Sequence, residues 1–201
     1  DKNEEKNQLS QIKWNVALMT NIFDQIASHN KDFLFVSSQL AGQAETTYGV
    51  TKRLGEMWTN LLGGVAVRVW NVYGTLEDST IKSHALSDFV NQAISKKEVR
   101  MLTTGDEWRQ FVHIDDVCNG FHLALNSDKL HRFVFDITSY DWIQVKDVAQ
   151  MICDMTGARL IPGKQIGREQ LNSSHMGKLR GWLPLVSLED GLRQMISQAK
   201  A

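Results

Sequence analysis

The segment from Phe33 to Glu56, FLFVSSQLAGQAETTYGVTKRLGE, decides the fold of this chain. It opens with Phe33–Val36, a short apolar run of strand length that is rich in strand-forming residues. Two serines follow this run, and a helical stretch then carries Tyr48 and Lys52. Because ligands of an open α/β sheet bind outside the carboxyl ends of its strands, the sequence predicts a ligand site beside the serines.

Tyr48 and Lys52 are four residues apart, so they share one face of a helix. A phenol alone has a pKa of about 10 and is a poor acid–base catalyst at neutral pH, but a neighbouring ammonium group lowers that pKa. A serine hydroxyl would then hold a substrate hydroxyl or carbonyl against the tyrosine oxygen. The pattern therefore predicts proton transfer during oxidation of an alcohol or reduction of a ketone.

These residues resemble the core of the extended short-chain dehydrogenase/reductases that modify nucleotide sugars, the NAD-dependent epimerase/dehydratase family. The family core reads Ser-Ser-x-x-x-Gly, a loop, Tyr-Gly-x-[Ser/Thr]-Lys, and a Glu four residues later. This chain has SSQLAG at 37–42, YGVTK at 48–52, and Glu56. The resemblance covers nearly the whole chain but only the later part of the family's fold.

The resemblance implies a role for each polar residue of this segment. Tyr48 is expected to be the acid–base group, and Lys52 the ribose anchor that also lowers the pKa of the tyrosine. Ser37 is expected to be the catalytic hydrogen-bonding partner, because it lies five residues before Gly42, and Ser38 to contact the substrate. The implied cofactor is NAD or NADP, which Tyr48 and Lys52 would help to hold.

Composition bounds the class of protein and its partners. The 201 residues are 42% hydrophobic and 22% charged, which is typical of a soluble globular chain with a sizeable core. The net charge of −1 gives no electrostatic reason to expect nucleic acid or an anionic membrane as a partner. Cys118 and Cys153 fit neither a disulfide framework nor a metal site, so no metal and a reducing, cytoplasmic setting are expected.

Periodicity and capping residues predict a chain of alternating helices and strands, and the resemblance implies an α/β fold with the later part of a Rossmann-like parallel sheet and a smaller α/β substrate-binding region. Helices are expected over 11–30, 83–95, 115–125 with Asp115 as N-cap, 145–155, and after Ser187; strands are expected over 33–36, 65–70, 98–103 and 133–137. Residues 1–75 would form the later part of the dinucleotide-binding domain. Residues 76–201 would form mainly the substrate-binding region, with about 105–126 returning to the sheet.

Two later segments also resemble the family. The apolar strand ending at Trp70 leads into Asn71, which resembles the Asn that contacts the nucleotide sugar, and Trp70 would flank the nicotinamide of the cofactor. GDEWRQFVHIDDV at 105–117 is similar to a family segment whose arginine, Arg109 here, grips the substrate pyrophosphate; a guanidinium fork suits phosphate oxygens. Arg168 is a further candidate for reaching the nucleotide.

We therefore expect an NAD(P)-dependent nucleotide-sugar epimerase or ketoreductase, which is an isomerase or an oxidoreductase. Its expected substrate is a nucleotide sugar, and a homodimer is a possible assembly. A 4,6-dehydratase is the first alternative, and it is disfavoured because neither Ser38 nor Gln39 is acidic. A non-catalytic truncated relative that binds a sugar nucleotide or a partner is the second. It is motivated by the lack, in these 201 residues, of the Gly-x-x-Gly-x-x-Gly turn on which the cofactor pyrophosphate sits.

The missing turn yields the first prediction. The 201-residue polypeptide alone should bind NAD and NADP weakly and turn nothing over, because the pyrophosphate has no seat on a helix N-terminus. Its first strand should also carry an exposed apolar edge that is prone to association. Titration with both cofactors, with light scattering to follow mass, tests this; micromolar affinity in a well-behaved monomer would contradict it.

Overall fold

The computed structural model describes five stretches of the chain, residues 2–29, 31–76, 84–127, 133–170 and 176–200. The chain divides into two compact units, each formed from three segments. Unit 1 comprises Asp1–Trp70, Asn119–Ile137 and Ser173–Trp182, and unit 2 comprises Asn71–Cys118, Thr138–Asn172 and Leu183–Ala201.

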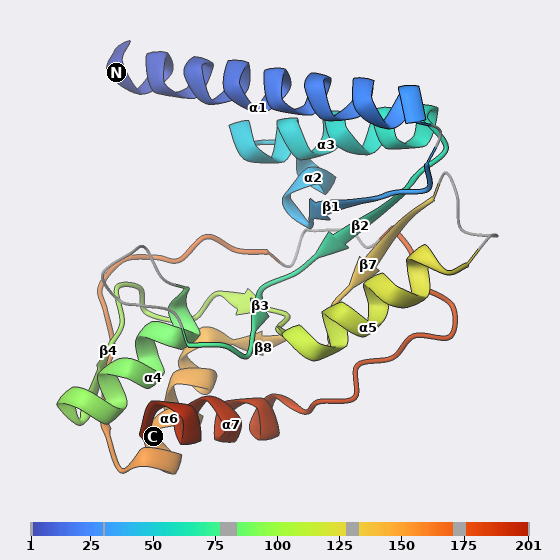
Figure 1. The fold of residues 1–201 in the computed structure, drawn as a ribbon. Coiled ribbons are helices and arrows are strands. Elements are labelled where there is room, and N and C mark those ends of the chain that lie inside the picture. The colour runs from blue at the N-terminus through green and yellow to red at the C-terminus, as the bar shows by residue number, and fades with distance from the viewer. Residues whose placement is uncertain (1, 30, 77–83, 128–132, 171–175, 201) are drawn as a thin grey trace. The chain divides into compact units, whose positions relative to one another are not determined.

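Unit 1 is built, in its described residues, on a three-stranded parallel sheet in the order β1-β2-β7. The strands are β1 (Leu34–Ser38), β2 (Val65–Val69) and β7 (Val134–Ile137), and the helices that precede β2 are α1 (Lys2–His29), α2 (Leu40–Gln43) and α3 (Thr47–Leu61). Helix α3 packs on β1 and β2, and α1 packs on α3 (Figure 1). Strand β1 pairs only with β2 among the described strands, so it is an edge strand, as expected.

Two local features fix the position of α3. Thr46 is its N-cap, and the Thr46 hydroxyl accepts a hydrogen bond of 3.0 Å from the backbone N–H of Gly49. Further along the helix, a Cβ at Gly55 would overlap the ring of Phe35 on β1. Glycine at this position therefore lets the helix approach the strand closely.

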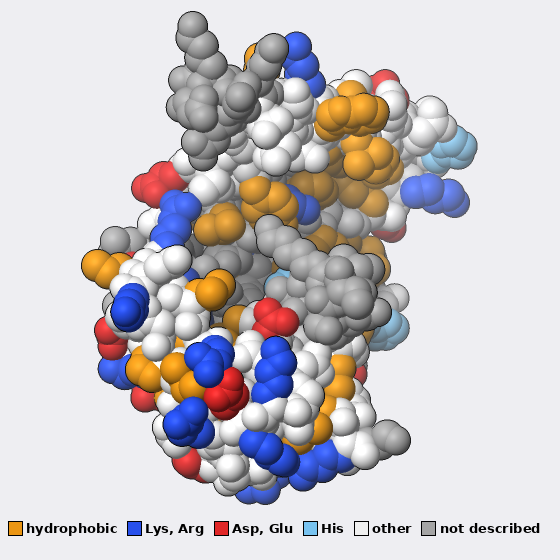
Figure 2. Space-filling model, turned by 90° about the vertical axis from the view of Figure 1, so that its left-hand side faces the viewer, with side chains coloured by type: hydrophobic (Ala, Val, Ile, Leu, Met, Phe, Trp, Pro, Cys, Tyr) orange, Lys and Arg blue, Asp and Glu red, His pale blue; other side chains and the backbone are white. Residues whose placement is uncertain are grey.

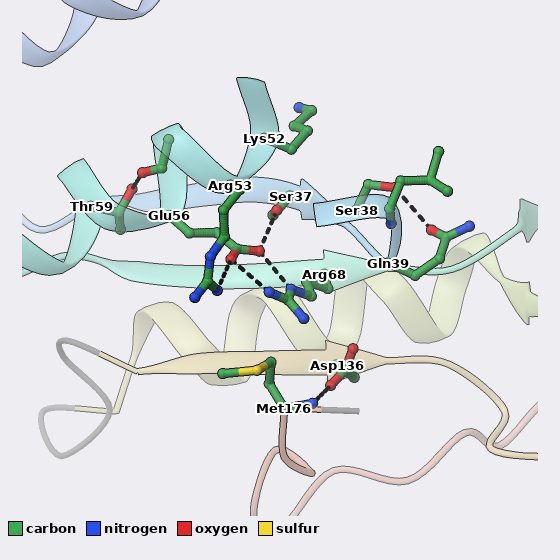
Figure 3. A network of polar contacts seen from close by, with 12 residues as sticks. Ser37, Ser38, Gln39, Lys52, Arg53, Glu56, Thr59, Arg68, Asp136 and Met176 are labelled. Atoms are coloured by element: carbon green, nitrogen blue, oxygen red, sulfur yellow. Dashed lines mark hydrogen bonds and ion pairs between the residues drawn. The ribbon is translucent and has the colours of Figure 1, made fainter. Parts of the chain in front are cut away.

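A buried ion pair then ties α3 to the sheet (Figure 3). Arg68 of β2 donates from Nε and Nη2 to the two carboxylate oxygens of Glu56 on α3, at 2.6 and 2.8 Å. The two side chains are 1% and 2% exposed. Ser37 of β1 donates to the same carboxylate at 2.7 Å. One carboxylate therefore joins α3 to two neighbouring strands.

Unit 2 contains three strand pairs and three helices of its own in the described residues. The parallel pairs are β3 (Val72–Tyr73) with β6 (Val112–His113) and β4 (Glu98–Arg100) with β9 (Arg159–Ile161); β5 (Trp108–Arg109) and β8 (Ile143–Gln144) are antiparallel. The helices α4 (Ala85–Lys96), α6 (Val145–Thr156) and α7 (Leu188–Lys200) pack on one another around a core that includes Phe89, Ile152, Leu192 and Met195. Ser187 caps α7 by accepting from the N–H of Asp190, as expected.

Helix α5 (Ile114–Leu125) contains the point where the chain passes from unit 2, which includes Cys118, to unit 1, which includes Asn119. It begins at Ile114, so the prediction of Asp115 as its N-cap is wrong. The Nδ1 atom of His113, directly before the helix, accepts a hydrogen bond of 3.3 Å from the N–H of Asp115. The side chain of Asp116 instead turns inward and accepts from the N–H groups of Leu185 and Val186, both at 3.0 Å.

The α/β fold class and the parallel sheet are confirmed, whereas several predicted boundaries differ from those observed. The first helix begins at Lys2 rather than at residue 11, and the strand predicted over 98–103 ends at Arg100. Ser83, the predicted start of α4, lies outside the described residues. Of the segment 105–126 that was predicted to return to the sheet, residues 119–126 lie in unit 1 and 105–118 in unit 2; the assignment of the two parts to domains and their functional roles stay a prediction.

The ion pair predicts a graded stability series. Glu56→Gln should lower the free energy of unfolding by about 3–5 kcal/mol, because it leaves the Arg68 charge buried and uncompensated. The double variant Glu56→Leu, Arg68→Met should be less destabilised, since no buried charge remains. Urea denaturation of the three proteins measures the series, and a double variant less stable than Glu56→Gln would contradict it.

The same carboxylate predicts acid sensitivity. Burial raises the pKa of Glu56, but hydrogen bonds from Arg68 and Ser37 outweigh burial and hold that pKa below its usual value of 4.5. The stability it contributes is therefore present above about pH 4.5 and lost as the pH falls through the lower folded-state pKa. Glu56→Gln should show less loss of stability across that acid range than the wild type.

Candidate active site and nucleotide cavity

Tyr48 and Lys52 lie on one face of α3, as the spacing predicted. Tyr48 is 48% exposed, and the Lys52 ammonium is 5.5 Å from the centroid of its ring. The same ammonium is 5.2 Å from the ring centroid of Phe35 and donates a hydrogen bond of 2.8 Å to the carbonyl oxygen of Val36. A half-buried cation and an accessible phenol therefore stand side by side at β1.

The two serines face different partners (Figure 3). The Ser37 hydroxyl, 1% exposed, is held by the carboxylate of Glu56. Ser38 is the side chain that lowers the pKa of Tyr48, against the larger effect of burial, which raises it. The Ser38 hydroxyl also donates to Gln39 Oε1 at 2.9 Å. Ser38 therefore acts on the pKa of Tyr48, whereas the family spacing predicts Ser37 as its catalytic partner, and the catalytic role of either serine stays a prediction.

The ionisation of this pair differs from the simple expectation. Burial raises the pKa of Tyr48, and the hydrogen bond with Ser38 offsets that rise only in part. Burial lowers the pKa of the Lys52 ammonium. The expected lowering of the tyrosine pKa by Lys52 is thus not found in this structure, where burial raises the pKa of Tyr48 and lowers that of Lys52.

Trp70 does not present its ring to a ligand in this structure. The side chain is 1% exposed, and its indole N–H donates to Asp136 Oδ1 at 2.9 Å. The other oxygen of Asp136 accepts from the backbone N–H groups of Met176 and Gly177. A contact of Trp70 with the cofactor stays a prediction. Asp136 was missed, although an aspartate inside the apolar run VFDI was a visible signal.

Asn71, Arg109 and the segment of Arg168, all predicted to bind the nucleotide, are brought together in unit 2. The Asn71 amide donates to the Gln110 carbonyl at 2.7 Å and to Gln170 Oε1 at 3.2 Å. Arg109 donates from Nη1 to the carbonyl of Trp108 and from Nη2 to the carbonyl of Arg168, at 2.8 and 2.6 Å. Burial lowers the pKa of Arg109, while the charges of Glu107 and Glu169 raise it.

A cavity of about 430 Å³ opens beside this cluster within unit 2. Asn71 and Arg109 line it together with apolar groups such as Leu86, Phe89 and Phe111. Glu107, which none of the predicted sites included, also lines it. Its position two residues before Arg109 was a usable signal, because alternate residues of an extended segment face the same side.

Three further observations bear on ligands. Among the described residues, no group of three or more His, Cys, Asp or Glu side chains could hold a metal ion. No helix in the described part of the chain is long and apolar enough to cross a membrane. On the face drawn in Figure 2, basic side chains are interspersed with acidic ones.

The fold and the grouped side chains define a Rossmann-like α/β chain with a Tyr-x-x-x-Lys helix. A family model, "NAD dependent epimerase/dehydratase family", matches residues 1–138, and the chain belongs to that family. In sequence it is 25% identical over 165 residues to a putative UDP-glucose 4-epimerase of Methanocaldococcus jannaschii, an alignment that covers 76% of this chain and 53% of the relative. The chain thus spans about half the length of that relative.

Other relatives match over more of their length. A dTDP-4-dehydro-6-deoxyglucose reductase of Escherichia coli is 20% identical, covering 99% of this chain and 70% of the relative. The fold is similar to that of UDP-glucose 4-epimerase of Thermotoga maritima with UDP-glucose, at a TM-score of 0.78 and 20% identity. The match covers 97% of this chain and 72% of the other. It is also similar to UDP-glucuronic acid 4-epimerase of Bacillus cereus with UDP-glucuronic acid and NAD. That match has a TM-score of 0.75 and 21% identity, and it covers 92% of this chain and 67% of the other.

The two serines give a matched pair of variants. Ser38→Ala should raise the pKa of Tyr48, because the hydrogen bond that lowers it is lost. Ser37→Ala should leave that pKa unchanged but lower the free energy of unfolding by about 1–3 kcal/mol, since a buried carboxylate loses a donor. NMR titration of ¹³Cζ-labelled tyrosine reads the pKa. A shift produced by Ser37→Ala and not by Ser38→Ala would contradict this assignment.

Proposed function

We propose that this chain carries the catalytic helix and the nucleotide cavity of an NAD(P)-dependent nucleotide-sugar epimerase or ketoreductase. The observation that carries the proposal is the cluster of Tyr48, Lys52 and Ser38 at the carboxyl end of β1. A half-exposed phenol, a half-buried ammonium group and a serine hydroxyl are the groups needed to move a proton to or from a sugar oxygen.

The cofactor would be NAD or NADP. Tyr48 and Lys52 fit its nicotinamide ribose, because the Lys52 ammonium is oriented by the Val36 carbonyl and stands beside an accessible phenol. The bound dinucleotide would supply the acceptor and donor of hydride. The residues of this chain would orient the sugar and handle the proton.

In this proposal Tyr48 exchanges a proton with the reacting hydroxyl or keto oxygen of the sugar. Ser38, which lowers the pKa of the tyrosine, would take the role that the family spacing had assigned to Ser37 and would hold the reacting oxygen. Burial keeps Tyr48 in its neutral form, so it is poised as an acid. The Lys52 charge would favour the phenolate once the proton has been transferred.

The nucleotide part of the substrate would occupy the cavity of unit 2. Arg109 would contact the pyrophosphate through its remaining N–H groups, and Asn71 would contact the nucleotide sugar from the same wall. Arg168 is a further candidate for phosphate binding. The relatives named as UDP-sugar epimerases and as a dTDP-sugar reductase support a nucleotide sugar as the substrate class.

The alternatives separate on particular residues. Dehydration needs a positioned acid and base, and neither Ser38 nor Gln39 is acidic. A non-catalytic sugar-nucleotide binder would keep the cavity but would need no accessible Tyr48.

A cytoplasmic setting and a homodimer stay predictions. The exposed side chains of Trp14 and Leu18 on α1 are apolar surface that a second copy could cover.

Tyr48→Phe tests the proposal in the natural protein supplied with cofactor and a nucleotide sugar. It should lower turnover by about a hundredfold or more, the usual scale for loss of a general acid–base group, while substrate affinity changes little. Tyr140→Phe, which removes a hydroxyl outside the cluster, is the control and should leave turnover unchanged. Near-normal turnover of Tyr48→Phe would remove this residue from the mechanism.

A further inference from the structure

The hydroxyl of Ser38, at the end of β1, has both of its hydrogen bonds with the two residues that follow it. It donates a bond of 2.9 Å to Oε1 of Gln39 (Figure 3). It accepts a bond of 3.3 Å from the backbone N–H of Leu40. Ser38 and Gln39 are each only 7% exposed. The partner of the hydroxyl proton is therefore a protein group to which solvent has little access.

The backbone around Gln39 is held against the helix that carries the tyrosine. Gln39 is the N-cap residue of α2, and its carbonyl oxygen accepts from the N–H of Gly42 at 3.0 Å. Helix α2 packs closely on α3, because a Cβ at Gly49 would overlap the carbonyl oxygen of Leu40. Gly49 directly follows Tyr48. The acceptor of the Ser38 proton thus stands on a fixed support beside the catalytic helix.

Two acceptors compete for one proton at Ser38. A serine hydroxyl has one donor and two acceptor lone pairs. In the structure the proton goes to Gln39, yet Ser38 also lowers the pKa of Tyr48, and a hydroxyl has that effect by donating to the phenolate. One hydroxyl cannot donate to both oxygens at the same time. It must therefore turn away from Gln39 when negative charge develops at the reacting oxygens.

We propose that Gln39 is a positioning residue that holds the Ser38 proton while the sugar presents a hydroxyl group, and releases it when the sugar presents a keto oxygen. The inference rests on the proposed function, since it concerns the same site. A sugar hydroxyl can donate to the remaining lone pair of Ser38, whereas a keto oxygen only accepts and requires the serine to turn and donate. Gln39 therefore favours the hydroxyl form of the substrate over the keto form, and it acts through Ser38.

A double-mutant cycle tests the competition in the full chain, with the pKa of Tyr48 read by NMR titration of ¹³Cζ-labelled tyrosine. Gln39→Leu removes the competing acceptor, and Gln39→Met replaces it by a weak one in an unbranched side chain of similar length. In both variants the pKa of Tyr48 should fall below its wild-type value. In the Ser38→Ala background the same substitutions should leave the pKa unchanged, because no hydroxyl remains to turn.

The cycle separates positioning from packing, because a general loosening of the structure would shift the pKa of Tyr48 alike in both backgrounds. An equal change in both backgrounds, or no change in Gln39→Leu and Gln39→Met, would overturn the inference. Neither result depends on substrate or cofactor. The proposed function and this inference can therefore fail separately.

A binding comparison reads the same preference at the substrate. Calorimetric titration with UDP-glucose and with UDP-4-keto-6-deoxyglucose gives the ratio of the affinities for a hydroxyl and a keto sugar. Gln39→Met should shift this ratio toward the keto sugar by about two- to tenfold, the scale of one neutral hydrogen bond. Gln39→Glu, which keeps an acceptor for the Ser38 proton, should not. An unchanged ratio in Gln39→Met would overturn the inference. A wild type that binds neither sugar nucleotide would contradict the proposed function, and the tyrosine titration would still decide the role of Gln39.

Discussion

The buried ion pair between Glu56 and Arg68 is the interaction on which the candidate active site depends. Tyr48, Lys52 and Glu56 follow one another at four-residue spacing, so they form a single stripe along α3. Within this stripe Glu56 is 2% exposed and is bound by Arg68 and Ser37, whereas Tyr48 is 48% exposed. Anchoring one end of a rigid helix fixes the position of the other end, about two turns away.

The anchor also explains why the two serines have different partners. Successive side chains of a strand point to opposite faces, so Ser37 and Ser38 cannot both face α3 at Glu56. Ser37 donates to the carboxylate of Glu56, and Ser38 donates to Gln39 at the end of the strand. Ser37, which the spacing to Gly42 selects as the catalytic serine, is the one bound to Glu56, and its catalytic role stays a prediction.

Local patterns predicted what depends on local geometry. The apolar runs predicted the parallel strands, the four-residue spacing predicted the shared face of Tyr48 and Lys52, and Ser187 predicted a helix cap. What depends on burial by distant segments could not be predicted. Trp70 is enclosed with Asp136, 66 residues later, and the Glu107 carboxylate is enclosed by Gly167. The raised pKa of Tyr48 could not be predicted either, because it follows from burial of the side chain.

The central claim is that the ion pair at Glu56 sets the surroundings of the catalytic stripe. The most direct measurement is the pKa of the Lys52 ammonium, by ¹H–¹⁵N NMR of lysine side chains, in the wild type and in folded Glu56→Gln. Burial lowers that pKa below 10.5 in the wild type. If the anchor positions α3, the value in the variant should move back toward 10.5, because the helix end loses its fixed place against β1. A Lys52 pKa that stays equally low in a clearly destabilised variant would contradict the account.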